Sequence, residues 1–94
     1  MQTKYYTYGN IIRILTLDDA DFTNSKMVDV NTEDETILST FDASRPFDAA
    51  FIRSYLNILS QSTVGFRPTS SPSVLSKANK IICDNNMKRK APSA

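Results

Sequence analysis

The chain contains no histidine, and this absence removes most of the common catalytic chemistry. Histidine is the commonest general base near neutral pH, the usual partner of a serine or cysteine nucleophile, and the commonest zinc ligand. The single cysteine, Cys83, can complete neither a structural zinc site nor a cysteine–histidine pair. We therefore predict that the protein is not an enzyme and that it holds no metal or other cofactor.

Two acidic runs carry oxygen ligands of the kind that Mg²⁺ and Ca²⁺ prefer, at residues 18–21 and 29–35. The second run begins like a calcium-binding loop. Its sixth position, however, is Asp34 where that loop needs glycine, and its twelfth is Thr40 where it needs a bidentate glutamate. Because Asp and Asn are common turn formers, we expect both runs to be solvated turns.

Binding of nucleotides or bases finds little support in the N-terminal half. Gly9 and Gly65 are the only glycines, so no glycine-rich phosphate loop exists. Tyr5, Tyr6 and Tyr8 resemble a base-stacking platform, but no run of basic, glycine and aromatic residues typical of an RNA-recognition sheet accompanies them. We expect these tyrosines to serve as strand formers.

The net charge of +1 conceals two halves of opposite charge. Residues 1–44 carry three basic and eight acidic residues, a charge of −5, and residues 45–94 carry eight basic and two acidic residues, a charge of +6. Within one domain such halves can neutralise each other, which is the expectation we favour. The alternative is an electrostatic partner.

The basic half supplies candidate contacts with phosphate groups: Lys77, Lys80, Lys88, Arg89 and Lys90. If these side chains share a face, they can contact several phosphates. Spread around the surface, they only keep the protein soluble. The last three also form a minimal basic address of the nuclear type, a pattern short enough to occur often by chance.

The N-terminal half has the pattern of a small antiparallel sheet. Residues 4–17 are two β-prone runs separated by a Gly-Asn pair, which suits a type II′ hairpin turn because glycine takes a positive φ. Short strands are predicted at residues 26–30 and 36–41.

The C-terminal half changes to a helical period. Phe47, Phe51, Tyr55 and Leu59 recur at every fourth residue, which predicts a helix over residues 46–60 with these side chains in the core. A loop rich in proline and serine should follow at residues 62–73.

A second, weaker helix is predicted over residues 73–86. Val74, Ala78 and Ile81 or Ile82 form its apolar face, and Lys77, Lys80 and Asp84 lie on another face. Cys83 is expected to be a small buried residue beside the isoleucines.

Together these patterns predict a small α+β fold. Its antiparallel sheet, made of the N-terminal hairpin and further short strands, is covered by one or two C-terminal helices. Ninety-four residues close about one hydrophobic core, so we expect a single domain over residues 1–87. Residues 88–94 would form a basic tail that is flexible or held by a partner.

We predict a small binding or accessory protein that docks on a larger protein or assembly. Tyr8, Phe66 and Arg67 are its candidate partner contacts, because aromatic and arginine side chains dominate protein interfaces. The alternative is a nucleic-acid-associated protein that uses the basic C-terminal half. No apolar run is long enough to span a bilayer and no signal peptide is evident, so the expected setting is cytoplasmic, in a host cell if the gene is viral or from a phage. The partner and the oligomeric state stay open.

Overall fold

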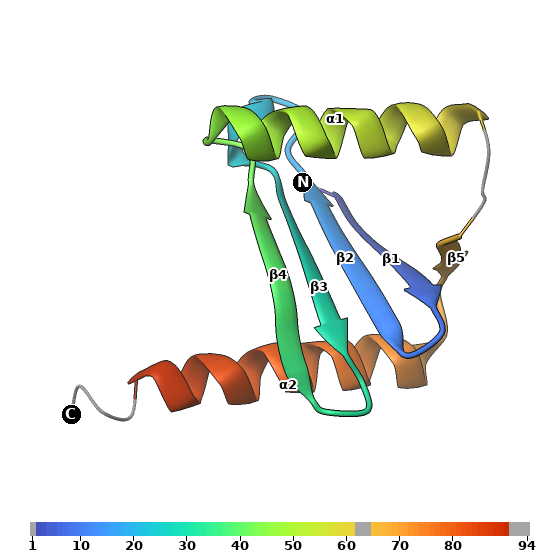
Figure 1. The fold of residues 1–94 in the computed structure, drawn as a ribbon, viewed down its shortest axis with the longest axis vertical. Coiled ribbons are helices and arrows are strands. Elements are labelled where there is room, and N and C mark those ends of the chain that lie inside the picture. The colour runs from blue at the N-terminus through green and yellow to red at the C-terminus, as the bar shows by residue number, and fades with distance from the viewer. Residues whose placement is uncertain (1, 62–64, 91–94) are drawn as a thin grey trace.

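The computed structural model describes residues 2–61 and 65–90. These residues form a five-stranded antiparallel sheet and two helices, which confirms the predicted α+β fold (Figure 1). In chain order the elements are β1 (Gln2–Tyr8), β2 (Ile11–Leu17), a 3-10 turn (Phe22–Asn24), β3 (Lys26–Asn31), β4 (Thr36–Asp42), α1 (Pro46–Gln61), β5 (Arg67–Thr69) and α2 (Pro72–Lys90). The strand order across the sheet is β4-β3-β2-β1-β5.

The predicted hairpin at the N-terminus is confirmed. β1 pairs with β2 around a two-residue loop, in a register that closes with Tyr8 opposite Ile11. Gly9 has φ of 59°, and among the described residues other than glycine only Glu35 has a positive φ. Asn10 therefore has a negative φ, which is the pattern of the predicted type II′ turn.

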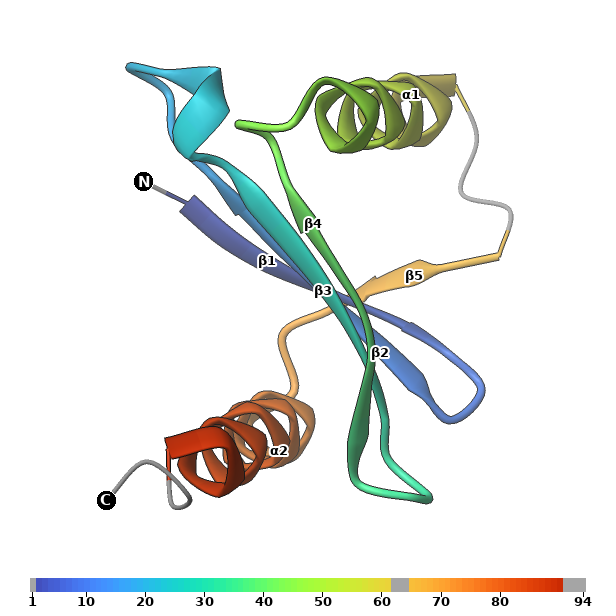
Figure 2. The ribbon, with the colours of Figure 1, turned by 60° about the vertical axis from the view of Figure 1, so that its left-hand side comes forward.

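The two helices lie on opposite faces of the sheet, as Figure 2 shows. Strand β2 explains this arrangement, because its successive side chains point to alternate faces and four consecutive ones are buried. Leu15 packs against residues of α1, whereas Ile12 and Ile14 pack against residues of α2. One central strand thus supplies two separate cores.

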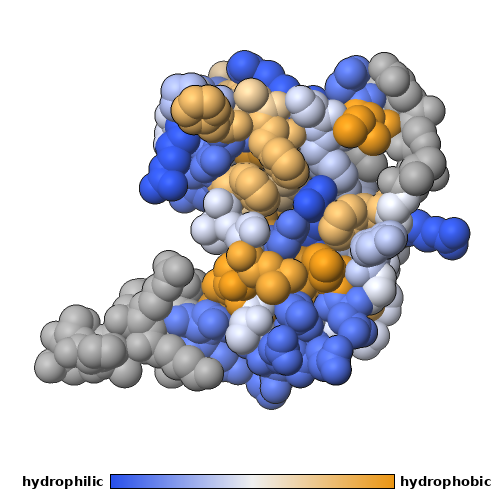
Figure 3. Space-filling model, in the orientation of Figure 1, coloured by the Kyte–Doolittle hydropathy of each residue, from blue (hydrophilic) through white to orange (hydrophobic). Residues whose placement is uncertain are grey.

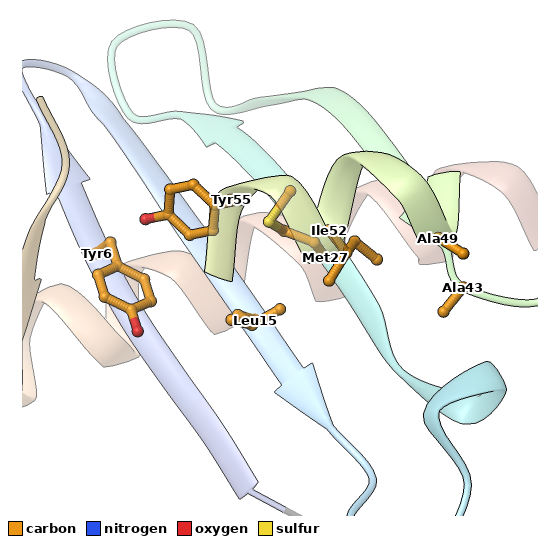
Figure 4. Packing of buried hydrophobic residues seen from close by; sticks show 7 residues of the cluster. All are labelled: Tyr6, Leu15, Met27, Ala43, Ala49, Ile52 and Tyr55. Atoms are coloured by element: carbon orange, nitrogen blue, oxygen red, sulfur yellow. The ribbon is translucent and has the colours of Figure 1, made fainter. Parts of the chain in front are cut away.

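The core on the α1 side (the α1-face core) has the following buried members: Tyr6, Leu15, Met27, Ala43, Ala49, Ile52 and Tyr55 (Figure 4). The expected core face of α1 was partly wrong, since Phe47 is 90% exposed and Phe51 is 44% exposed. The apolar side chains of α1 cover a wider part of its circumference than one sheet can contact. The helix buries the side with the small Ala49 and Ile52, which leaves the two phenylalanines at the rim. The side chain of Leu59 lies outside the described part.

The core on the other side (the α2-face core) consists of Ile12, Ile14, Val30, Ala78 and Ile81. Val74 and Ile82 pack against it, so the predicted apolar face of α2 is confirmed. The prediction for Cys83 was wrong, because this residue is exposed. It follows the buried Ile81 by two positions, which places it about 200° around the helix axis from the core.

Two C-terminal boundaries differ from the sequence predictions. The segment expected to be only a loop contains β5, which pairs with β1 in the register Tyr5 to Thr69, Tyr6 to Pro68 and Thr7 to Arg67. Proline within a run argues against a central strand, but an edge strand accepts it. Helix α2 runs to Lys90, so the backbone of residues 88–90 is helical, and residues 91–94 lie outside the described part.

Neither helix, over its described residues, combines the length and the apolar character that crossing a bilayer requires.

Candidate docking surface

A cluster of aromatic rings surrounds one buried arginine beside α1. We call Arg13, Phe51, Tyr55, Phe66 and Tyr8 the arginine–aromatic cluster. Figure 3 shows the molecule from the side of α1, where apolar atoms lie along the helix and again lower on the molecule, with hydrophilic atoms between them.

An ion pair forms the centre of the cluster. Arg13 on β2 is directly opposite Asp29 on β3, and its Nε and Nη2 donate to the two carboxylate oxygens at 2.8 and 2.9 Å. The side chains are only 10% and 12% exposed. Burial lowers the pKa of Arg13, but the hydrogen bonds and charge of Asp29 outweigh this effect, so the pKa lies above its ordinary value. The guanidinium remains charged.

Three rings pack around this guanidinium. Its central carbon lies 4.1 Å from the ring centroid of Phe66, 4.5 Å from that of Tyr55 and 5.8 Å from that of Phe51. A cation at these distances is attracted by the negative face of each ring. Arg13 therefore connects α1 and the segment before β5 to the middle of the sheet.

Tyr55 is the most enclosed ring of the cluster. Its hydroxyl is buried without a hydrogen bond of good geometry among the described residues, and the Arg13 guanidinium lies over its ring. Burial raises the pKa of Tyr55 above its ordinary value of 10, and the positive charge of Arg13 opposes this shift only in part. Burial likewise raises the pKa of Tyr6, whose ring meets Tyr55 edge to face at 5.7 Å.

Of the three candidate partner contacts, Tyr8 and Phe66 meet at one edge of the sheet, whereas Arg67, opposite Thr7 at the same edge, has its side chain on the face that carries α2. The rings of Tyr8 and Phe66 lie 5.6 Å apart, and Tyr8 is 57% exposed. Arg67 follows Phe66, pairs with Thr7 and is exposed. The sequence therefore singled out two members of the cluster, Tyr8 and Phe66, while Arg67 lies outside it.

The inner members were missed by sequence reasoning, although β2 contained a signal for them. An arginine in a run of isoleucine and leucine must either break the strand or be buried with a partner, because an unpaired buried charge is very costly. Asp29, at the same place in the next strand, was the available partner. The expectation that residues 29–35 form a solvated turn was therefore wrong for Asp29, which is buried within β3.

The rim of α1 adds apolar surface beside the cluster. Phe47, Phe51 and Ile58 lie within about 40° of one another around the helix axis, and Ile58 is 52% exposed. The ring of Phe51 stacks on Phe41 of β4, with centroids 4.5 Å apart and planes at 2°. Phe51 is thus held against the sheet, whereas Phe47 projects into solvent.

The candidate phosphate contacts lie elsewhere. Lys77 and Lys80 are exposed on α2, and residues 88–90 continue the same helix, with side chains outside the described part. Arg53 belongs to α1 on the other side of the sheet, where its guanidinium packs over Phe22 at 4.5 Å. The bases of the two helices therefore lie on opposite faces of the sheet.

The first acidic run stabilises its own turn. Asp18 Oδ1 accepts hydrogen bonds from the N–H groups of Ala20 and Asp21, and its Oδ2 accepts one from the Asn24 side chain. These hydrogen bonds lower the pKa of Asp18, and the one from the N–H of Ala20 has the largest effect. In the described part of the chain, no three Asp, Glu or Cys side chains gather as a metal-ligand set.

The β1 tyrosines do not form a common stacking platform. Tyr6 is buried in the α1-face core, while Tyr5 packs against the α2-face core and its hydroxyl lies 3.4 Å from the Asn79 side chain of α2. Tyr8 is the exposed member of the three.

The chain matches no protein-family model, no curated protein and no solved structure. The proposals below therefore rest on the geometry of the chain's own residues.

Proposed function

We propose that the protein is a small, non-enzymatic binding protein that docks on a larger protein or assembly through Tyr8, Phe66 and Arg67. The observation that carries the proposal is the contact between the exposed ring of Tyr8 and the half-buried ring of Phe66, which in turn packs on the buried Arg13. We propose a cytoplasmic setting, in a host cell if the gene is viral or from a phage. A lone exposed thiol such as Cys83 stays reduced there.

Pre-organisation of the ring pair supports this proposal. Aromatic and arginine side chains supply most of the free energy of binding at protein interfaces. A side chain that is already fixed loses less conformational entropy on binding. Phe66 contacts Tyr55 as well as Arg13, so it is held in place before any partner arrives.

The apolar rim of α1 supports the same proposal. Phe47, Phe51 and Ile58 are large apolar side chains that are at least 44% exposed. Exposed apolar side chains that lie together are typical of protein contact surfaces. The rim would extend the contact from the edge of the sheet along α1.

Site-specific photo-crosslinking tests the docking proposal. A photoreactive phenylalanine analogue replaces Tyr8 in one variant and Ser76, an exposed residue of α2, in a matched control. In an extract of cells that express the protein, we expect the variant with the analogue at position 8 to give a discrete crosslinked product. The control with the analogue at position 76 should give none. Arg67→Glu should abolish this product, and Lys80→Gln should leave it. Equal products from both positions, or no change with Arg67→Glu, would refute the proposal.

Nucleic-acid binding is the second candidate, favoured by the continuation of α2 through residues 88–90. These bases share one helix with the exposed Lys77 and Lys80. Titration with duplex and single-stranded nucleic acid at two salt concentrations decides the matter. Tight binding that weakens steeply with salt, and that Lys77→Gln and Lys80→Gln reduce evenly across sequences, would favour this candidate over docking.

A further inference from the structure

Strand β1 is only partly covered on its outer side. The pairing with β5 extends from Thr7 to Tyr5 and stops there. The chain then leaves β5 at Thr69 and enters α2 at Pro72. Figure 1 shows that β5 is much shorter than β1 and lies beside only one end of it.

The backbone of Thr3 points toward this uncovered side. A two-residue hairpin closes with a hydrogen-bonded pair, here Tyr8 and Ile11, and the direction of the N–H and C=O groups alternates along an antiparallel strand. Tyr6 therefore bonds to β2, which explains why Pro68, without an N–H group, can lie opposite it on β5. Thr3 has the other parity, so its N–H and C=O point away from β2.

A pocket of about 400 Å³ lies at this uncovered edge. Tyr6, Pro68 and Leu75 supply apolar surface to it, and Thr3 lines it as well. Lys4 is the one charged residue of its lining. We call this pocket, together with the outer edge of β1 at Thr3, the β1 notch.

The opposite edge of the sheet is protected by a bulge in β4 and by contacts at both ends of that strand. The register of β4 skips Leu38, which marks a β-bulge. The N–H of Asp42 donates to Asp48 Oδ2 of α1 at 3.1 Å, and the carbonyl of Glu35 accepts from the Asn85 side chain of α2 at 3.2 Å. Bulges and covered backbone groups are the usual protection of an edge strand. The β1 notch lacks both devices within the described residues.

We propose that the β1 notch binds an extended, acidic peptide segment, which continues the line of β5 along β1. The backbone of the segment pairs with the N–H and C=O of Thr3, its carboxylate meets the ammonium group of Lys4, and an apolar side chain fills the pocket beside Leu75. The positive charge of Lys4 in the lining of the pocket selects an acidic segment over a basic one. This inference rests on the proposed docking function, because the notch shares its edge with Tyr8 and Phe66.

Nuclear magnetic resonance with two peptide pools tests the proposal. Both pools consist of blocked pentapeptides that are randomised over the residues other than proline and cysteine. The central position is fixed as glutamate in one pool and as lysine in the other. Titrated into the ¹⁵N-labelled full chain, the glutamate pool should shift the amide signals of Thr3, Lys4 and Ser70, and the lysine pool should shift them less. Equal shifts with both pools, or none with either, would overturn the proposal.

Variants of the notch identify its two recognition elements. Thr3→Pro removes the outward N–H, leaves the ladder to β2 intact and should abolish the shifts, whereas Thr3→Val retains the N–H and should preserve them. Lys4→Gln should weaken binding of the glutamate pool roughly two- to fivefold, which is the range for an exposed ion pair. Lys4→Glu should reverse the preference between the pools. If Thr3→Pro does not fold, the two Lys4 variants still test the proposal. Unchanged binding of both peptide pools by both variants would refute the recognition of an acidic segment by Lys4.

The docking function and the notch can fail separately. Tyr8→Ala, which removes the exposed ring at the other end of the edge, should leave the peptide-induced shifts at Thr3 unchanged. Loss of crosslinking at Tyr8 with retained peptide shifts would thus refute the docking surface alone. Retained crosslinking without peptide shifts would refute the notch alone.

Discussion

Arg13 and Asp29 are joined across β2 and β3 by two hydrogen bonds of 2.8 and 2.9 Å, in a position where strand register places them directly opposite each other. Each side chain neutralises the charge of the other in a part of the sheet that is nearly inaccessible to solvent. The rings of Phe66 and Tyr55 pack on the outer side of the guanidinium. The same pair thus stabilises the fold and holds the rings of the candidate docking surface.

Removing one partner of this pair should be far more damaging than removing both. Arg13→Met leaves a buried carboxylate without a counter-ion and should cost about 3–5 kcal/mol of unfolding free energy. The double variant Arg13→Met with Asp29→Leu should recover much of that loss, because no uncompensated charge remains. Urea denaturation of the four proteins of this cycle measures the coupling. Additive losses from the two substitutions would contradict the coupled pair.

Two substitutions in α1 test which side of the helix faces the sheet. Ile52→Ala deletes a fully buried side chain of the α1-face core and should cost about 2–5 kcal/mol. Phe47→Ala removes a larger but exposed ring and should change the unfolding free energy by less than about 0.5 kcal/mol. Chemical denaturation gives both values, and a larger loss for Phe47→Ala than for Ile52→Ala would mean that another side of the helix faces the sheet.

Alkaline solution should destabilise the protein through its buried phenols. The pKa values of Tyr6 and Tyr55 are raised in the folded state, so above the ordinary pKa of 10 the unfolded chain releases these protons first. The stabilisation that the neutral phenols provide is complete below pH 10 and is lost as the pH rises toward the folded values. Denaturation between pH 8 and 11 measures the decline, and Tyr55→Phe should make it shallower. A parallel decline in wild type and variant would exclude Tyr55 as a source.

Purified protein should contain no stoichiometric metal. The oxygen atoms of Asp18 that a cation would need already accept hydrogen bonds from the turn around them. Elemental analysis after purification without chelators should therefore find neither zinc nor calcium at one equivalent. A bound equivalent that Asp18→Asn removes would make the first acidic run a metal site after all.

Local signals in the sequence sufficed for the hairpin, for the strands β3 and β4 and for the existence of both helices. A Gly-Asn pair between β-prone runs restricts the backbone so strongly that the hairpin can be predicted without knowledge of the rest of the fold. The rotation of α1 on the sheet was not predictable in this way, because Phe47 and Phe51 are as apolar as Ile52. The shapes of the facing residues, such as Met27 and Ala43, decide which side of the helix is buried.

Strand β5 and the arginine–aromatic cluster were beyond local reasoning for a different reason. Arg67–Thr69 becomes a strand only because β1, some sixty residues earlier in the chain, presents a free edge to it. Similarly, Arg13 finds its partners in β3, in α1 and before β5, and no spacing within one segment reveals such a meeting. Tyr8 and Phe66 could be singled out by residue type, but their contact could not.

The division of the interior between two faces has a consequence for the order in which the chain can fold during synthesis. Tyr55 is the last buried member of the α1-face core in chain order, so this core can begin to close before residues 78–81 have been made. Ile12, Ile14 and Val30, on the other face, are covered only after Ala78 and Ile81 have been made, more than twenty residues after Tyr55. Until then the nascent sheet presents an uncovered apolar side, the kind of surface that chaperones bind and that promotes aggregation. A message cut short before Ala78 would make that transient exposure permanent.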